Sequence, residues 1–141
     1  MTAPSPLIHA SCVAAKGRGL LILGPSGSGK SGLALQLIAL GAQLVADDQT
    51  ILTVEAGGLV ARCPEALAGM IEARGLGLLA APSVSFAQVA LVVDLGQCED
   101  QRLPPPRKIT MLGCTVDLVL RAQIDHFPAA ILHYLRYGRR A

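Results

Sequence analysis

The sequence predicts an α/β domain with a mixed, mainly β sheet and a short C-terminal helix. First, an apolar segment at residues 19–23 leads through a glycine-rich loop into a helical stretch, which makes a strand–loop–helix unit. Second, short apolar or alternating segments separated by turn residues fill positions 42–120, as expected for strands. Third, residues 128–137 carry an apolar stripe at helical spacing. A chain of 141 residues can bury one hydrophobic core, so we expect a single domain over residues 1–141.

Composition excludes several functional classes. The net charge of +2 is too small for nucleic-acid binding by bulk electrostatics, and 3% aromatic residues without Trp argue against base stacking. No apolar run approaches the ~18 residues of a membrane span, and the N-terminus lacks the pattern of a signal peptide. We therefore expect a cytoplasmic protein with no nucleic-acid or membrane partner. Its high apolar fraction, 52%, suggests that part of the surface is a subunit interface.

The glycine-rich loop is the most informative motif. It fits the pattern G-x-x-x-x-G-K-[ST] and consists of Gly24, Pro25, Ser26, Gly27, Ser28, Gly29, Lys30 and Ser31. Glycines let the backbone wrap a phosphate, so that N–H groups and the N-terminus of the following helix face the anion. Lys30 would neutralise β/γ oxygens and the Ser31 hydroxyl would reach Mg²⁺. The alternative is a strand-to-helix turn with no ligand, but the motif predicts binding of a nucleoside triphosphate or another polyphosphate.

The segment before the loop brings a histidine into its neighbourhood. Residues 7–15 alternate loosely and predict a strand, and the turn at 16–19 predicts a hairpin with the loop's own strand. This hairpin would place His9 beside the glycine-rich loop. A lone histidine in an apolar strand is more often packed or at the surface than functional.

Two carboxylates follow the helix that comes after the loop. Residues 31–40 are apolar almost all round, which predicts a helix buried on more than one side. Residues 42–48 predict a buried strand that ends in Asp47 and Asp48. Adjacent residues of a strand point to opposite faces, so we expect different roles, one near a metal ion and one accepting a proton from a hydroxyl. An exposed turn is the alternative.

The middle of the chain predicts a hairpin, residues 50–54 and 59–62, and one helical turn with Pro64 at its first position. Residues 70–80 then place Glu72 and Arg74 on the same face of a strand that leads into G-x-G. Charges in so apolar a segment are unfavourable unless they pair or bind a ligand, and an internal Glu72–Arg74 ion pair is one of these options.

The last third of the chain predicts a central strand at residues 88–95, because these are almost all aliphatic. A proline-containing loop at 98–108 cannot join a sheet ladder. A hairpin, residues 108–112 and 115–120, and the terminal helix complete the prediction.

Three motifs in this order resemble the catalytic domain of the HPr kinase/phosphorylase family. They are the glycine-rich loop, the sequence V-A-D-D at residues 45–48 and the sequence I-E-A-R-G-L-G at residues 71–77, within a resemblance that runs from about His9 to Leu120. The resemblance implies a P-loop kinase core of the phosphoenolpyruvate-carboxykinase-like type. It also implies a short form without the family's N-terminal domain, and a hexamer.

The resemblance assigns roles to matching residues. His9 takes the position of the family's active-site histidine, and Lys30 and Ser31 keep their phosphate and magnesium roles. Asp47 and Asp48 match the family's tandem aspartates, one of which exchanges a proton with the target serine. We favour Asp48 for this role, with Asp47 near the metal ion.

The remaining roles fall later in the chain. Glu72 matches the family's metal-associated glutamate, so that Ser31, Asp47 and Glu72 form the expected Mg²⁺ set. Arg74 would contact the transferring phosphate, and Arg102 resembles a catalytic arginine in a later loop. The family's arginine- and glycine-rich segment, which is tied to dephosphorylation, corresponds here only to residues 119–123.

The implied activity is ATP-dependent phosphorylation of a serine of the phosphocarrier protein HPr, with reverse phosphorolysis as the less supported half. Two alternatives remain: another small P-loop kinase, and a non-catalytic nucleotide or phosphate sensor. The sensor would keep Lys30 and Ser31 but would not need Asp47 and Asp48.

Overall fold

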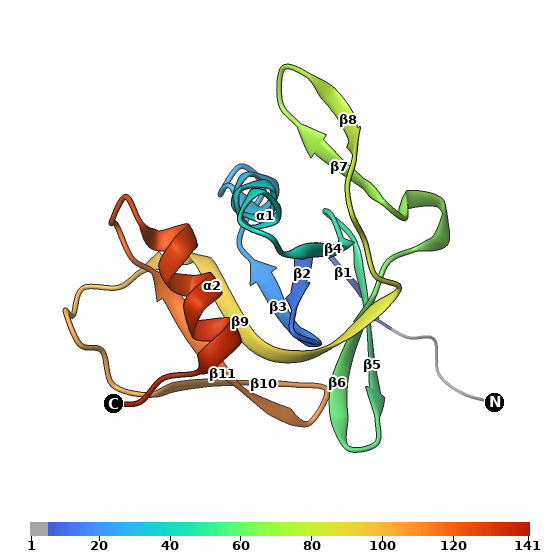
Figure 1. Ribbon diagram of the computed structural model, residues 1–141. Helices are drawn as coiled ribbons and strands as arrows, with labels where there is room; N and C mark the ends of the chain where they lie inside the picture. Colours follow the sequence, from blue (N-terminus) through green and yellow to red (C-terminus); the bar gives the residue numbers. More distant parts are fainter. Residues whose placement is uncertain (1–5) are drawn as a thin grey trace.

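The computed structural model describes residues 6–141 and shows a mixed sheet with two helices (Figure 1). Within these residues, nine strands form the main sheet, in the order β1-β5-β6-β9-β3-β2-β4 with β10 and β11 attached beside β9, and two form a separate hairpin. The elements are β1 (Leu7–Ile8), β2 (Ser11–Ala15), β3 (Arg18–Leu23), α1 (Lys30–Ala39), β4 (Gln43–Ala46), β5 (Thr50–Glu55), β6 (Gly58–Arg62), η1 (Glu65–Leu67), β7 (Met70–Ala73), β8 (Gly77–Ala80), β9 (Phe86–Cys98), β10 (Arg107–Met111), β11 (Cys114–Arg121) and α2 (Phe127–Tyr137).

The long strand β9 aligns the part of the sheet from which the glycine-rich loop emerges. It pairs in parallel with β3 and with β11, so that Asp94 lies level with Leu23 and with Leu120. Parallel strands end at the same edge of a sheet. The last residue of β11, Arg121, therefore emerges at the edge where β3 passes into the loop.

Side chains of the central strands alternate between two apolar clusters. In β3, Leu20 and Ile22 lie in the cluster that includes residues of α1 and α2, whereas Leu21 lies in the cluster that includes residues of β5 and β6. This alternation follows from the pleat of the strand. Both helices thus cover the same face of the sheet (Figure 1).

The burial of α1 corrects the expectation of a helix buried on more than one side. Its fully buried residues form a single stripe, namely Lys30, Leu33, Ala34 and Leu37. Leu35 and Ile38 are only partly buried against the core, and Leu40 is 47% exposed. The reason is that α1 packs against β2, β7 and α2, while its remaining side faces solvent or the cleft described below.

The predicted strand at residues 7–15 is broken in the middle. β1 and β2 are separated by His9 and Ala10, because Ala10 bonds to other partners: its N–H donates to Asp48 O (3.1 Å) and its carbonyl accepts from Thr50 Oγ1 (2.8 Å). The chain leaves the regular ladder at this point, and His9 lies in the resulting bend.

Three further details differ from the sequence prediction. β4 ends at Ala46, so Asp47 and Asp48 lie in a turn and not on the pleated strand. β7 ends at Ala73, so Arg74 lies in the turn of the β7–β8 hairpin and does not share a strand face with Glu72. Pro64 precedes a short 3₁₀ turn as its N-cap and does not occupy the first helical position.

The β7–β8 hairpin stands away from the main sheet beside α1 (Figure 1). Leu76 in its turn is 79% exposed. Neither helix of the described residues is long and apolar enough to cross a bilayer.

Candidate functional site

The glycine-rich loop connects β3 to α1 in a conformation that its glycines permit. Gly24, Gly27 and Gly29 have φ values of 151°, 82° and 98°, a region that residues with a Cβ rarely adopt. Ser28 N donates to Pro25 O (3.0 Å), which closes the loop on itself. Gly29 is the N-cap of α1 and provides no side-chain cap, and the first turn carries no acidic residue. The N–H groups at this helix end are therefore available to an anion.

Lys30 is held against this loop. Its side chain is buried, at 6% exposure, and its ammonium group donates to Gly24 O (2.8 Å) and Pro25 O (3.1 Å). An ammonium group has a further N–H beyond these two. The positive charge consequently lies beside the backbone N–H groups of the loop, which is the arrangement that recognises a phosphate.

Asp47 joins three segments of the chain at the wall of the site. Its Oδ1 accepts from Ser31 Oγ (2.7 Å) and Ser11 Oγ (2.9 Å), and its Oδ2 accepts from the backbone N–H of Glu72 (3.0 Å). The residue is 8% exposed. Hydrogen bonds from β2, α1 and β7 thus hold this carboxylate in place.

Asp48, in contrast to the buried Asp47, is exposed to solvent. Its side chain is 56% exposed, and its Oδ1 shares a hydrogen bond with Nε2 of His9, whose side chain is 51% exposed. The backbone of Asp48 has a φ of 66°, and Gln49 N donates to Asp47 O across it (2.7 Å). This tight turn, and not the strand pleat, sends the two adjacent aspartates in different directions.

A cleft of about 650 Å³ collects most of the residues that the sequence singled out. Its lining includes His9, Ser26, Gly27, Gly29, Lys30, Ser31, Asp48, Glu72 and Arg74. Asp47 lies behind Ser31 rather than on the surface of the cleft. The volume falls within the range of small-molecule sites, ~300–1,000 Å³. Backbone N–H groups, two cations (Lys30 and Arg74) and two acids (Asp48 and Glu72) thus converge on one open space.

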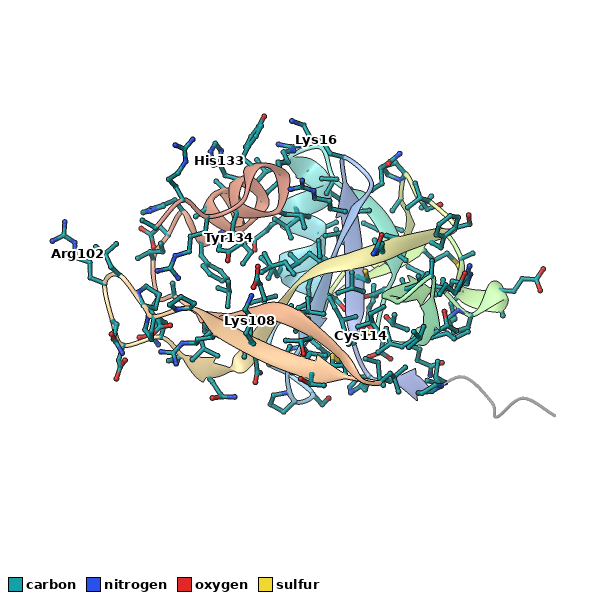
Figure 2. All side chains as sticks on the ribbon, turned by 90° about the horizontal axis from the view of Figure 1, so that it is seen from below. Lys16, Arg102, Lys108, Cys114, His133 and Tyr134 are labelled. Carbon is teal, nitrogen blue, oxygen red and sulfur yellow. The ribbon has the colours of Figure 1, made fainter. Side chains whose placement is uncertain are left out.

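The structure does not bring Arg102 into this cleft. Arg102 projects outward from the loop between β9 and β10 (Figure 2), and it borders a different cavity, between that loop, β11 and α2. Glu72 and Arg74 form no ion pair with each other within the described residues. The ion pair near Arg102 is instead that of Glu99 with Arg107 (2.9 Å), whose hydrogen bond lowers the pKa of the Glu99 carboxyl.

The sequence analysis placed Arg121 only within the segment 119–123 and gave it no role of its own, and the structure brings it to this site. Its guanidinium donates to Ser28 O in the glycine-rich loop and, through Nε, to Leu95 O (3.1 Å) at the end of β9. The parallel alignment of β11 with β9 and β3 delivers it to the loop. The sequence signals were its place in the segment 119–123 and a charge at the end of an apolar strand, and neither predicts contact with the loop.

The groups near Ser31 are hydroxyl and carboxylate oxygens, which are the type of ligand that Mg²⁺ prefers. Mg²⁺ binds through one or two carboxylates, keeps waters and takes the remaining ligands from substrate phosphates. Ser31 Oγ and Asp47 Oδ1 lie 2.7 Å apart, and Glu72 lines the same cleft. The described residues contain no group of three or more His, Cys, Asp or Glu side chains that could hold a metal by themselves. Such a site would therefore depend on a bound phosphate for its completion.

Together, the sheet, the glycine-rich loop opening α1 and the acid-lined cleft define an α/β protein with a phosphate-binding type of site. The family model described as the HPr serine kinase C-terminal domain matches residues 1–103. This chain belongs to that family, as the three motifs predicted.

Relatives with curated names support the same assignment. The HPr kinase/phosphorylase of Bordetella pertussis is 47% identical over 78 residues, which cover 55% of this chain and 25% of that protein. The HPr kinase/phosphorylase of Clostridium acetobutylicum is 38% identical over 107 residues, covering 71% of this chain and 35% of the relative. The chain thus matches about a quarter to a third of the length of these relatives.

A solved structure covers nearly the whole chain. The Hpr(Ser) kinase/phosphatase from Coxiella burnetii superposes with a TM-score of 0.78 at 29% sequence identity, over 93% of this chain and 94% of that one. The mixed α/β architecture is therefore that of this kinase structure.

We expect Gly24→Ala to disrupt the loop. A Cβ on Gly24 would lie 2.4 Å from Ser28 Oγ and would stand on a backbone with a φ of 151°. Clash and strain should together lower stability by about 1–3 kcal/mol and abolish ATP binding, measured by thermal unfolding and calorimetry. Gly32→Ala is the matched stability control, because a Cβ there meets nothing within 4 Å. Equal melting temperatures and equal ATP affinity for Gly24→Ala and the unmodified chain would contradict this expectation.

We expect Arg121→Met to weaken ATP binding about tenfold, equivalent to about 1.4 kcal/mol, with little change in melting temperature. The reason is that the variant loses the bonds that tie the loop to β9 and β11. Arg139→Met is the control, since Arg139 also donates to backbone carbonyls, those of Pro104 and Ala141, but away from the loop. Isothermal titration with ATP measures both. Equal affinities in the two variants would show that Arg121 does not support the loop.

Proposed function

We propose that this chain is a catalytic domain that transfers phosphate from ATP to a serine of the phosphocarrier protein HPr. The single observation that carries the proposal is the position of Asp48. Its exposed carboxylate lies with His9 in the cleft that the glycine-rich loop, Glu72 and Arg74 also line. A carboxylate in reach of a bound polyphosphate is what transfer to a hydroxyl requires, whereas a sensor of phosphate would not need it.

The donor would bind along the glycine-rich loop, in a P-loop kinase core of the phosphoenolpyruvate-carboxykinase-like type. The uncapped N-terminus of α1 and the Lys30 ammonium would face the β- and γ-phosphates. Ser31, Asp47 and Glu72 would hold Mg²⁺, which when bound neutralises charge on the phosphate oxygens. Ser26 and Gly27 line the cleft and would lie against the phosphates.

The acceptor serine would be activated by Asp48 rather than Asp47. Asp47 is buried, and both of its oxygens accept hydrogen bonds from the protein. In Asp48 the bond to His9 involves Oδ1, which leaves Oδ2 to accept the proton of an incoming hydroxyl. As the serine oxygen attacks the γ-phosphorus, its proton passes to Asp48 Oδ2, the bond to the β-phosphate oxygen breaks, and ADP leaves.

His9 and Arg74 would complete the transfer site. His9 holds Asp48 in one orientation through the shared hydrogen bond. Arg74 lines the same cleft from the β7–β8 turn, where its charge would stabilise the transferring phosphate. Arg102, the other predicted catalytic arginine, borders a different cavity, and its loop would have to move to reach the cleft of the glycine-rich loop. The geometry therefore supports Arg74 more strongly in this role.

The reverse reaction follows from the same groups. Inorganic phosphate would occupy the place of the leaving ADP, attack the phosphoserine phosphorus and form pyrophosphate. Asp48, protonated, would return its proton to the serine oxygen, as microscopic reversibility requires. The names of the relatives include phosphorylase and phosphatase, which supports this half of the proposal.

We further propose that residues 1–141 act as one catalytic domain, in the cytoplasm, within a homo-oligomer such as a hexamer. Exposed apolar side chains support an assembly, among them Leu76, Leu78 and Leu103 at 79%, 69% and 80% exposure. Single exposed apolar residues are common, but the first two share one projecting hairpin.

The transfer itself is tested by mixing the chain with Mg-ATP and HPr from the same organism and measuring intact mass. We expect HPr to gain one phosphate on a serine, located by fragmentation. A folded, ATP-binding chain that adds no phosphate would contradict the kinase function and favour a nucleotide sensor. Phosphate added to a small molecule but not to HPr would favour another P-loop kinase.

Asp48→Asn should retain ATP binding and lose transfer by about 10²–10⁴-fold, because an amide cannot accept the serine proton. Asp117→Asn is the control, since it makes the same change at an exposed carboxylate that pairs with Lys108 on β10, outside the cleft. Calorimetry with ATP and the intact-mass assay measure the two effects separately. Transfer at the unmodified rate by Asp48→Asn would assign the base to another group.

A further inference from the structure

We propose that Ser11 is a positioning residue, whose hydroxyl holds the two aspartates in one fixed relation and so keeps Asp48 directed to the acceptor. This inference rests on the proposed phosphoryl transfer for its kinetic consequence. Its structural part, that Ser11 holds the backbone of Asp48 in place, can be tested without any transfer.

The surroundings of Ser11 give its hydroxyl two partners, one from each aspartate. Ser11 begins β2 opposite Ile22 of β3 and is 0% exposed. Its Oγ donates to Asp47 Oδ1 (2.9 Å) and accepts from the backbone N–H of Asp48 (3.2 Å). A hydroxyl can donate once and accept as well, so one oxygen bonds the side chain of one aspartate and the main chain of the next.

A serine at this position needs an explanation from its contacts. The rest of β2 is Cys12, Val13, Ala14 and Ala15, all buried, and a small apolar residue would fit this strand. A buried hydroxyl is unfavourable unless it is hydrogen-bonded. Both side-chain hydrogen bonds of Ser11 are made with the two aspartates, and these bonds explain why a serine occupies this buried position.

The turn at Asp48 shows what the hydroxyl must hold. Asp48 has a φ of 66° and lies at the centre of a three-residue turn closed by Gln49 N and Asp47 O (2.7 Å). Turns of this hydrogen-bond pattern with positive φ are rare and strained for residues that carry a Cβ. Such a conformation persists only when surrounding contacts maintain it.

The contacts that maintain the turn come from one short segment. Ala10 N donates to Asp48 O (3.1 Å), Ser11 Oγ accepts from Asp48 N, and His9 bonds the Asp48 carboxylate. Without the Ser11 hydroxyl, the N–H of Asp48 loses this acceptor and the turn can relax. The carboxylate would then leave its position beside His9.

Ser11 also supports Asp47 independently of the loop. Ser11 and Ser31 both donate to Asp47 Oδ1. If Ser31 turns toward a bound ligand, Asp47 keeps the hydrogen bond from Ser11. The carboxylate therefore stays in place whether or not the cleft is filled.

The test compares Ser11→Ala with Cys12→Ala. Cys12 is a matched control because it follows Ser11 in β2, is equally buried, at 0% exposure, and its Sγ donates to Val13 O (3.8 Å) rather than to either aspartate. For each variant we would measure the melting temperature, the kcat and KM for ATP in HPr phosphorylation, and the hydrogen-exchange rate of the Asp48 amide by NMR.

We expect Ser11→Ala to lower kcat by about tenfold or more with KM for ATP within about twofold, because the base moves while Asp47 keeps its hydrogen bonds from Ser31 and from the Glu72 N–H. The Asp48 amide should exchange at least about tenfold faster than in the unmodified chain, since it has lost its acceptor. Cys12→Ala should retain kcat even if its melting temperature falls by as much as that of Ser11→Ala.

Three results would overturn the inference: an unchanged kcat in Ser11→Ala, an equal loss of kcat in both variants, or unchanged protection of the Asp48 amide. If the unmodified chain transfers no phosphate to HPr, the proposed function fails. The amide exchange of Asp48 then decides the role of Ser11 by itself, with faster exchange in Ser11→Ala supporting it and equal exchange contradicting it.

Discussion

The hydrogen bonding of the Asp47 carboxylate is the constraint on which the rest of the cleft depends. It accepts hydrogen bonds from Ser11 of β2, Ser31 of α1 and the backbone of Glu72 in β7. Burying a carboxylate is unfavourable unless such donors surround it. Asp47 can therefore be buried only because these three elements converge on it, and its hydrogen bonds in turn hold the three elements together. The β7–β8 hairpin is not part of the main sheet, and the Asp47 carboxylate joins it to Ser31 at the end of the glycine-rich loop.

The sheet sets the second condition, which is where the loop lies. β3 and β11 both run parallel to β9, so the loop and Arg121 emerge at one edge. The loop conformation itself depends on glycines with positive φ and on Lys30, which donates to two of its carbonyls. The glycine-rich loop and the strained turn at Asp48 line the same cleft but are held by different segments of the chain. This arrangement is consistent with the proposed phosphoryl transfer, in which the protein positions the groups and neutralises charge.

Much of the fold could be predicted from local pattern. The glycine-rich loop, α1, the hairpins and β9 all follow from apolar periodicity and turn residues, and the motifs at residues 24–31, 45–48 and 71–77 identified the family. The errors have two causes. The break at His9 and the end of β4 at Ala46 depend on hydrogen bonds between segments far apart in the chain, such as Ala10 with Asp48, which a local pattern does not contain. Arg74 lies in a local turn, closed by the bond from Leu76 N to Ala73 O, within a segment whose apolar pattern continues through the turn.

The sequence by itself determined the chemistry available to this protein: a glycine-rich loop of the kind that binds phosphate, two adjacent carboxylates, a histidine, and a glutamate and an arginine two residues apart. These are properties of residue type and short spacing, and they need no partner across the fold. Only the tertiary structure decided how the groups are used. It buried Asp47 and exposed Asp48, placed Arg121 on the loop, left Arg102 outside the cleft and put the Ser11 hydroxyl between the aspartates. Burial and hydrogen-bond partners arise from contacts between distant segments, and such contacts exist only once the chain has folded.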